Sequence, residues 1–271
     1  MVVMQPQERI MSAPPLSVST APSGLGRDHV ASTRPRADWL SIPDTLPPEP
    51  AAAAWWVRKG QVEHAALART TRLALELVSV GAPPTLVLAV QRAAMEQVEH
   101  AKLCFGLAAA FGAGPVGPGT LDVRDVFADG VDLVTVARRL VADVCVPESL
   151  AALEMAAAAS RTADPGLREA LGVLADDGRR HGELGWRCLR WLLARGGGAL
   201  RREVSLALER ALDAVESEPV VGGIGLVDYG ILPPLLRYEV RQEGRHAVLA
   251  EVASDLLDPF EMAMAVDLIA S

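Results

Sequence analysis

The fold is decided by the stretch Glu96-Gln-Val-Glu-His-Ala-Lys-Leu-Cys-Phe105, in which polar residues fall on the apolar stripe of a helix. The stripe consists of six residues at steps of four and three: Ala93, Gln97, His100, Cys104, Leu107 and Phe111. Such steps place all six on one face of an α-helix. A second stripe, along residues 171–192, repeats the pattern with Gly178 and His181 on it. The sequence therefore predicts two long helices that each carry a histidine on the buried face.

Helix breakers divide the chain around these stripes into four long helical patterns. The patterns run over about 52–80, 85–111, 132–162 and 164–195. Gly81-Ala-Pro-Pro84 ends the first pattern, and Asp164 followed by Pro165 is a typical start for the fourth. Pro147 predicts a kink in the third, because proline lacks the N–H that a helix interior needs. Four long helices separated by breakers predict an all-α four-helix bundle.

The chain divides into three parts by composition. Residues 1–50 hold nine of the 19 prolines and many serines, which predicts a disordered leader. The bundle takes residues 51–198. Residues 199–271 predict a C-terminal appendage of extra helices over about 200–215, 235–257 and 259–269, with a Gly/Pro-rich loop at 222–234.

The charge balance and the cysteine content exclude several kinds of protein. Lysine and arginine total 26 against 34 acidic residues, whereas a nucleic-acid binder needs a basic face. The uncharged stretch of residues 103–120 is broken by glycines and prolines, so we expect no membrane span. Three cysteines are too few for a disulfide framework, and no secretory signal is visible, so we expect a cytoplasmic protein.

Two glutamates join the two histidines on the faces that we expect to be buried. Glu63 lies in line with apolar residues of the first helix, and Glu148 lies in line with those of the third. A buried carboxylate costs several kcal/mol unless it is paired or bound to a metal. Two glutamates and two histidines that meet in an apolar bundle therefore predict either a metal site or two Glu–His ion pairs.

Four segments resemble a bacterial branch of the ferritin-like superfamily, in the right order and over roughly residues 55–200. They are Gln61-Val-Glu-His-Ala-Ala66, Glu96-Gln-Val-Glu-His-Ala-Lys-Leu-Cys-Phe105, Pro147-Glu-Ser-Leu-Ala-Ala-Leu-Glu154 and Asp177-Gly-Arg-Arg-His-Gly-Glu-Leu-Gly-Trp-Arg187. In that superfamily, two lone glutamates and two Glu-x-x-His motifs hold a di-iron or di-manganese centre. The resemblance implies that Glu63 and Glu148 are the lone carboxylates, and that His100 and His181 are the histidines.

The chain departs from this pattern in both Glu-x-x-His motifs. Gln97 and Gly178 stand where the resemblance requires the two glutamates. An acid does occur one position earlier in each half, as Glu96 and Asp177. These acids could form a modified ligand set with the histidines four residues later, or they could lie at the flank of the bundle as surface charges. The register of the stripes favours the flank.

The leading functional expectation is a metal-binding ferritin-like protein, with iron, manganese or zinc bound as one ion or not at all. The ligands would be Glu63, His100, Glu148 and His181, and the activity an iron oxidoreductase linked to O₂ or peroxide. One alternative is a metal-free pseudoenzyme that binds a partner. Another is a tailoring enzyme for a small organic molecule, with space for it beside Gly178 and Gly185. We expect a monomer or a homodimer rather than a cage.

Overall fold

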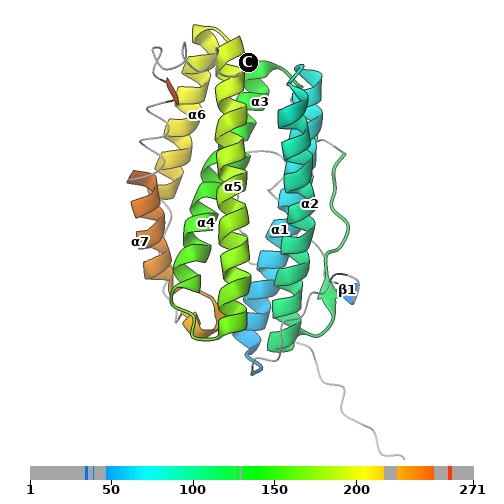
Figure 1. Ribbon diagram of the computed structural model, residues 1–271, viewed down its shortest axis with the longest axis vertical. Coiled ribbons are helices and arrows are strands. Elements are labelled where there is room, and N and C mark those ends of the chain that lie inside the picture. Colours follow the sequence, from blue (N-terminus) through cyan, green and yellow to red (C-terminus); the bar gives the residue numbers. More distant parts are fainter. Residues whose placement is uncertain are drawn as a thin grey trace, which may run out of the picture.

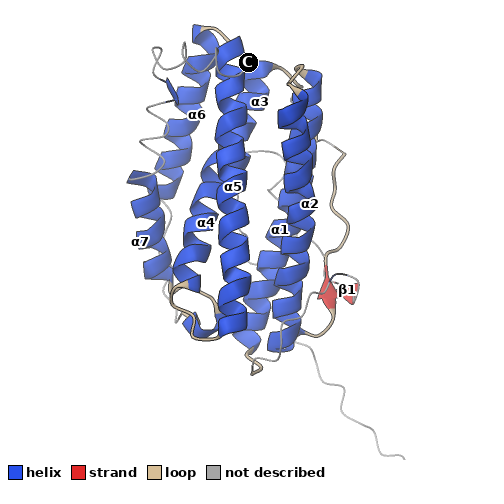
Figure 2. Cartoon of the chain, in the orientation of Figure 1, coloured by secondary structure: helices blue, strands red, loops and turns tan. Residues whose placement is uncertain are grey.

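The computed structural model of this 271-residue chain describes residues 34–35, 39, 47–124, 126–128, 130–216, 225–246 and 256–257. The expected disordered leader lies almost wholly outside the described residues, as does the helix expected over 259–269. The described part is mostly helical, which confirms the all-α prediction (Figure 2). Within it, no helix is long and apolar enough to cross a membrane.

The elements follow one another much as the helix breakers predict. The long helices are α1 (Pro50–Ser79), α2 (Pro84–Ala108), α4 (Val146–Ala159), α5 (Pro165–Arg195) and α6 (Gly198–Glu216). The shorter ones are α3 (Leu133–Leu140), α7 (Pro234–Gly244), the 3₁₀ turn η4 (Val227–Tyr229) and the π-helical segments η2 (Ala109–Ala113) and η3 (Val141–Cys145). Strands β1 (Arg34–Pro35) and β2 (Val116–Gly117) pair antiparallel.

Local chemistry explains where the first helical pair begins and turns. The Glu49 side chain accepts a hydrogen bond from the backbone N–H of Ala51, and Pro50 occupies the first turn of α1, where no N–H is required. Gly81 has a positive φ of 73°, a conformation that glycine adopts without strain, and it turns the chain after α1. The chain then enters α2 at Pro84, so both helices lie within a few residues of their predicted bounds.

The third predicted helix is interrupted, and the interruption lies before Pro147 rather than at it. Asp132 caps α3 by accepting from the backbone N–H groups of Val134 and Thr135. The helix widens into η3 and resumes as α4, with Pro147 in the first turn. Since proline clashes with the carbonyl four residues earlier, at Asp143, the wider turn accommodates the ring. The expected kink is therefore present as a π-helical segment.

The helices pack as two pairs with a C-terminal layer beside them. Helix α1 packs along α2, α4 packs along α5, and the pairs meet where α2 contacts α5. Figure 1 shows α1 and α2 on the right, α4 and α5 in the middle, and α6 and α7 on the left. Helix α6 contacts α3 and η3, and α7 lies on α4, where Arg241 Nη1 donates to Glu154 Oε1 at 2.6 Å. Residues 247–255, expected to extend this last helix, lie outside the described residues.

The apolar core is divided into two clusters. One cluster gathers residues such as Leu77, Leu140 and Leu189 with the inner face of α6. The other gathers residues such as Trp56 and Phe111. On α1, α2 and α5, the polar residues singled out from the sequence fall between the stretches that belong to the two clusters. A layer of polar side chains therefore crosses the interior between two apolar clusters.

Glycines on α5 bring the backbones of the second pair close together. A Cβ atom placed on Gly182 would lie 2.8 Å from Ser149 Oγ, and one on Gly185 would lie 3.0 Å from Val144 Cγ1. One on Gly178 would lie 3.4 Å from Ala152 Cβ. The expected space for a substrate beside Gly178 and Gly185 is therefore filled by α4 and η3.

Candidate functional site

The structure brings five of the residues predicted from the sequence into one polar layer. The polar layer consists of Glu63 on α1, Gln97 and His100 on α2, Glu148 on α4 and His181 on α5. Gln97 is 1% exposed and both histidines are 4% exposed, as the stripe register predicts. The sixth position, Gly178, is buried against α4 and contributes no side chain. At such buried positions, a polar atom that lacks a hydrogen-bond partner raises the free energy of the folded protein.

His181 is held between two carboxylates. Its Nε2 lies 2.7 Å from Glu96 Oε2 on α2. Its Nδ1 faces inward, 3.9 Å from Glu148 Oε2. A carboxylate only accepts hydrogen bonds, so the short contact with Glu96 places a ring proton on Nε2. In the neutral ring, the Nδ1 lone pair is then directed into the layer.

His100 repeats this arrangement in the other half. Its Nε2 lies 2.9 Å from Asp177 Oδ2 on α5, and its Nδ1 lies 3.8 Å from Glu63 Oε2. The two imidazole rings face each other with centroids 5.5 Å apart. The resemblance between the two halves of the sequence therefore has a structural counterpart, in which each histidine is held by an acid from the opposite helix.

Glu96 and Asp177 are not the ordinary surface charges that the flank interpretation predicts, because each binds a buried histidine. The Glu96 side chain is 38% exposed and that of Asp177 is 15% exposed. Arg180 binds Asp177 and comes within 3.6 Å of Glu96 Oε1. Facing inward, the same two acids bind the outer nitrogens of the histidines. Metal-binding histidines in proteins are commonly held in this way by a carboxylate on the second nitrogen.

Gln97 occupies the space between Glu148 and His181. Its Nε2 donates to Glu148 Oε1 at 3.3 Å and lies 3.3 Å from His181 Nδ1. Its Oε1 is buried, and within the described part of the chain it has no hydrogen-bond partner. The amide thus satisfies the two acceptors beside it and leaves its own acceptor unpaired.

Lys59 is the member of this site that sequence reasoning missed. Its Nζ lies 2.5 Å from Glu63 Oε1, and the two side chains are 15% and 10% exposed. Burial opposes ionisation of Lys59, but the charge of Glu63 outweighs burial and raises the pKa of the ammonium group. The available signal was the spacing, because Lys59 precedes Glu63 by four residues and so shares its helix face.

Glu63 and Glu148, the two inner carboxylates of the polar layer, differ in the charges around them. Burial raises the pKa of Glu148, and the nearby charge of Glu63 adds to this effect. Burial acts on Glu63 in the same direction, but Lys59 reverses it and holds the pKa of Glu63 below its ordinary value. Glu148 therefore lacks the neutralising cation that Glu63 already has.

The cysteines lie in the core rather than in the polar layer. Cys104, Cys145 and Cys188 are all buried and make no disulfide. Burial raises the pKa of all three thiols, that of Cys188 to about 12. Such thiols are poor nucleophiles at neutral pH, which agrees with their interpretation as small core residues.

The four predicted ligands form two pairs and not one cluster. Each histidine lies near one inner glutamate, and the distances within the pairs are 3.8 and 3.9 Å. In the described ranges, no group of three or more His, Cys, Asp and Glu side chains is arranged to hold a metal ion. Gln97 is a further polar side chain within 3.3 Å of both Glu148 and His181.

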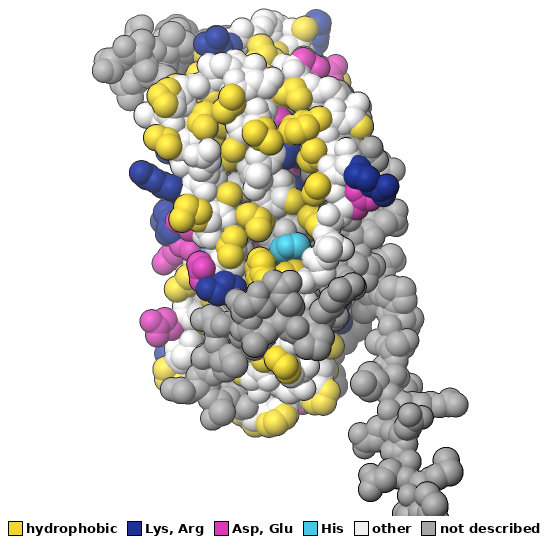
Figure 3. Space-filling view, turned by 90° about the vertical axis from the view of Figure 1, so that its right-hand side faces the viewer, with side chains coloured by type: hydrophobic (Ala, Val, Ile, Leu, Met, Phe, Trp, Pro, Cys, Tyr) yellow, Lys and Arg dark blue, Asp and Glu magenta, His cyan; other side chains and the backbone are white. Residues whose placement is uncertain are grey.

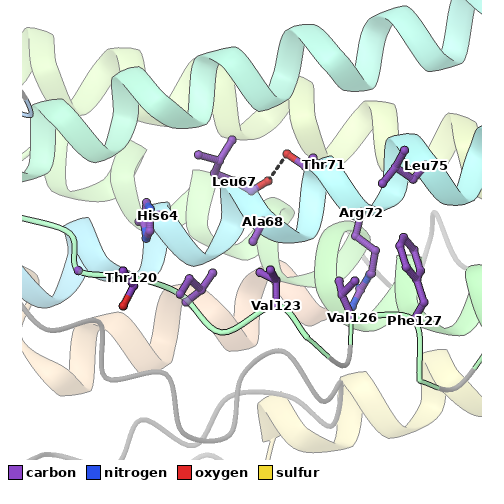
Figure 4. Close-up of a pocket in the computed structure, with 12 residues that line it drawn as sticks. His64, Leu67, Ala68, Thr71, Arg72, Leu75, Thr120, Val123, Val126 and Phe127 are labelled. Atoms are coloured by element: carbon purple, nitrogen blue, oxygen red, sulfur yellow. Dashed lines mark hydrogen bonds between the residues drawn. The ribbon is translucent and has the colours of Figure 1, made fainter.

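A surface groove of about 530 Å³ lies apart from the polar layer, between α1 and residues 119–127 (Figure 4). It is lined mainly by apolar side chains, with His64 at one end and Arg72 toward the other. His64 also meets the Trp39 ring edge to face, with centroids 5.5 Å apart. The face on the right of Figure 1 carries many exposed apolar side chains (Figure 3).

Comparison of the chain with protein-family models, with curated proteins and with solved structures found no match.

Proposed function

We propose that this chain is a ferritin-like protein that binds one divalent transition-metal ion through Gln97, Glu148 and His181. The observation that carries the proposal is the set of distances among these groups. The Gln97 amide lies 3.3 Å from Glu148 and 3.3 Å from His181, and the last two lie 3.9 Å apart. Donor atoms that share an ion with bonds of about 2.0–2.2 Å lie roughly 3.0–3.5 Å from one another. The two distances from Gln97 fall in this range, and the distance between His181 and Glu148 would have to shorten when an ion binds.

The chemistry of the three groups fits a single ion. Rotation of the Gln97 amide by half a turn would exchange its Nε2 for its Oε1, a neutral oxygen donor that now has no partner among the described residues. His181 already directs the Nδ1 lone pair inward, because Glu96 holds its Nε2. Imidazole, carboxylate and amide oxygen together suit Fe(II), Mn(II) or Zn(II).

The charges around Glu148 and His181 favour the binding of a cation between them. Burial and the charge of Glu63 raise the pKa of Glu148, which means that the carboxylate is poorly compensated as it stands. A bound ion would supply that compensation. Glu96 would increase the basicity of His181 through the 2.7 Å contact with its Nε2.

Three protein ligands would leave coordination positions for O₂, peroxide or another small molecule, which the ion would polarise when bound. The protein contributes a fixed geometry and a dry environment. Apolar clusters lie on both sides of the layer, and His181 is only 4% exposed. An oxidoreductase linked to O₂ or peroxide is therefore the activity we propose to assay first once metal binding is measured.

A second candidate, a metal-free protein that binds a partner, is favoured by the present direction of the Gln97 amide. With Nε2 inward, Gln97 satisfies Glu148 and His181 without an ion. In that case the polar layer would be a structural network, and the function would lie elsewhere on the molecule.

Titration of variants with Zn(II) by calorimetry tests the first candidate against the second. Gln97→Leu should weaken binding at least tenfold, because it removes one of three ligands, and Gln97→Glu should strengthen it. Gln91→Leu is the matched control, since Gln91 is an exposed glutamine on the same helix. Binding by Gln97→Leu that equals that of the control would overturn the proposal in favour of the metal-free candidate.

A further inference from the structure

The polar layer contains two matched positions for a positive charge, one beside each inner carboxylate. His100 Nδ1 lies 3.8 Å from Glu63, and His181 Nδ1 lies 3.9 Å from Glu148. An acid holds the Nε2 of each ring from the opposite helix, at 2.9 and 2.7 Å. Both halves therefore present an acid–histidine pair of the same geometry.

The halves differ in the group that meets the inner carboxylate. Glu148 meets the neutral amide of Gln97 at 3.3 Å. Glu63 meets the ammonium group of Lys59 at 2.5 Å. Lys59 comes from the same helix as Glu63, one turn earlier, and its side chain is mostly buried. One of the two positions thus already holds a full positive charge that the chain supplies.

We propose that Lys59 takes the place of a second metal ion and limits the polar layer to one. The two-metal centre that the ferritin-like resemblance implies does not fit here. The ammonium group of Lys59 is paired with the Glu63 carboxylate, which a second ion would need as a ligand. This inference rests on the proposed function, which supplies the single ion expected in the natural protein.

Charge supports this assignment. Lys59 and Glu63 form a neutral pair, whereas a dication beside an ammonium group at a few ångströms would meet strong repulsion in a poorly solvated interior. A second ion would therefore have to displace Lys59 from Glu63 before it could bind.

The chain offers a matched control, because Lys59 and Lys102 are its only lysines. Lys102 pairs with Glu99 at the surface. In protein freed of metal with a chelator, Lys59→Met should lower Tm by roughly 5 °C, since it leaves Glu63 without its partner. Lys102→Met should leave Tm within about 2 °C of the natural value, because exposed ion pairs stabilise little.

Counting bound Zn(II) by elemental analysis then separates this inference from the proposed function. We expect one ion in the natural protein and in Lys102→Met, and two in Lys59→Met, with Lys59→Arg like the natural protein. If the natural protein binds none and Lys59→Met binds one, the inference stands and the proposed function fails. If Lys59→Met is folded and binds the same number of ions as Lys102→Met, the inference is overturned, whatever the natural protein binds.

Amine acetylation of the natural protein provides a readout that needs no folded variant. Mass spectrometry should find Lys102 modified and Lys59 protected until the protein is unfolded, because the ion pair with Glu63 keeps Lys59 charged and covered. Equal acetylation rates at the two lysines in the native protein would contradict the pairing on which the inference depends.

Discussion

Two individual side chains make the two halves of the polar layer differ. The two histidines, the inner glutamates and the outer acids keep a paired arrangement across the layer. Gln97 and Lys59 are the two side chains that differ between the halves. Glu148 meets the amide of Gln97, whereas Glu63 meets the ammonium group of Lys59. Under the proposed function, these two side chains determine which half of the layer accepts an ion.

The outer acids allow a prediction at the scale of one residue. Glu96→Gln should weaken Zn(II) binding about tenfold or more, because an amide is a poorer partner than a carboxylate for the Nε2 proton of His181. Calorimetric titration measures the effect. Glu99→Gln is the control, since Glu99 lies on the same helix with a side chain that is 66% exposed. Equal affinities in the two variants would show that Glu96 does not support the ligand.

At this scale the sequence predicts the inward-facing residues well and their contacts poorly. Helical periodicity places all four predicted ligands on buried faces, and it is right for Glu63, His100 and His181 but not for Glu148, which is half-buried. It does not show that each histidine reaches an acid on the opposite helix, because that contact depends on how α2 and α5 pack. Lys59 was missed for a related reason, since the flexible stem of lysine reaches a buried partner from the edge of its helix face.

Among the elements, α5 depends on its glycines for close packing against α4. Gly182→Ala should destabilise the protein by about 1–3 kcal/mol, because the new Cβ would lie 2.8 Å from Ser149 Oγ. Gly178→Ala should be neutral or stabilise by up to about 1 kcal/mol, because its Cβ would make an ordinary contact at 3.4 Å and alanine favours the helix. Urea unfolding of both variants measures the difference. The reverse order of stabilities would show that the helices pack differently.

The start of α3 gives a prediction that depends on pH. Hydrogen bonds from Thr135 and Val134 lower the pKa of Asp132, so the ionised cap stabilises the helix above the ordinary pKa of the group. This contribution is lost as pH falls through the lowered pKa. Asp132→Ala should therefore cost about 1 kcal/mol near pH 7 and distinctly less near pH 3. Unfolding curves at the two pH values measure it, and a cost that does not change with pH would contradict the capping role.

Element bounds are predictable from the sequence where caps and breakers are strong. Asp164 and Pro165 mark the start of α5, and the helix begins there. The interruption between α3 and α4 could not be placed, because the sequence shows Pro147 but not how the preceding turn accommodates it. The packing role of Gly182 and Gly185 was likewise invisible, since a glycine in a helical pattern equally suits open space.

For the whole molecule, the burial of polar side chains between two apolar clusters costs free energy of folding, and this cost calls for an explanation. The polar layer separates two apolar clusters that could otherwise form one continuous core. Replacement of buried polar networks by apolar side chains is often neutral or stabilising in proteins. A layer with two carboxylates, two histidines and a glutamine therefore supports the proposal that the interior has a function, and metal binding is the function that we propose for it.

The most direct test of this account is the number of metal ions that the intact protein holds. The protein would be exposed to Fe(II), Mn(II) and Zn(II) without oxygen, freed of excess metal and measured by elemental mass spectrometry. The account predicts one tightly bound ion, which is lost in His181→Ala and retained in His246→Ala, where the replaced histidine is exposed. Two ions in the natural protein, or none, would contradict it.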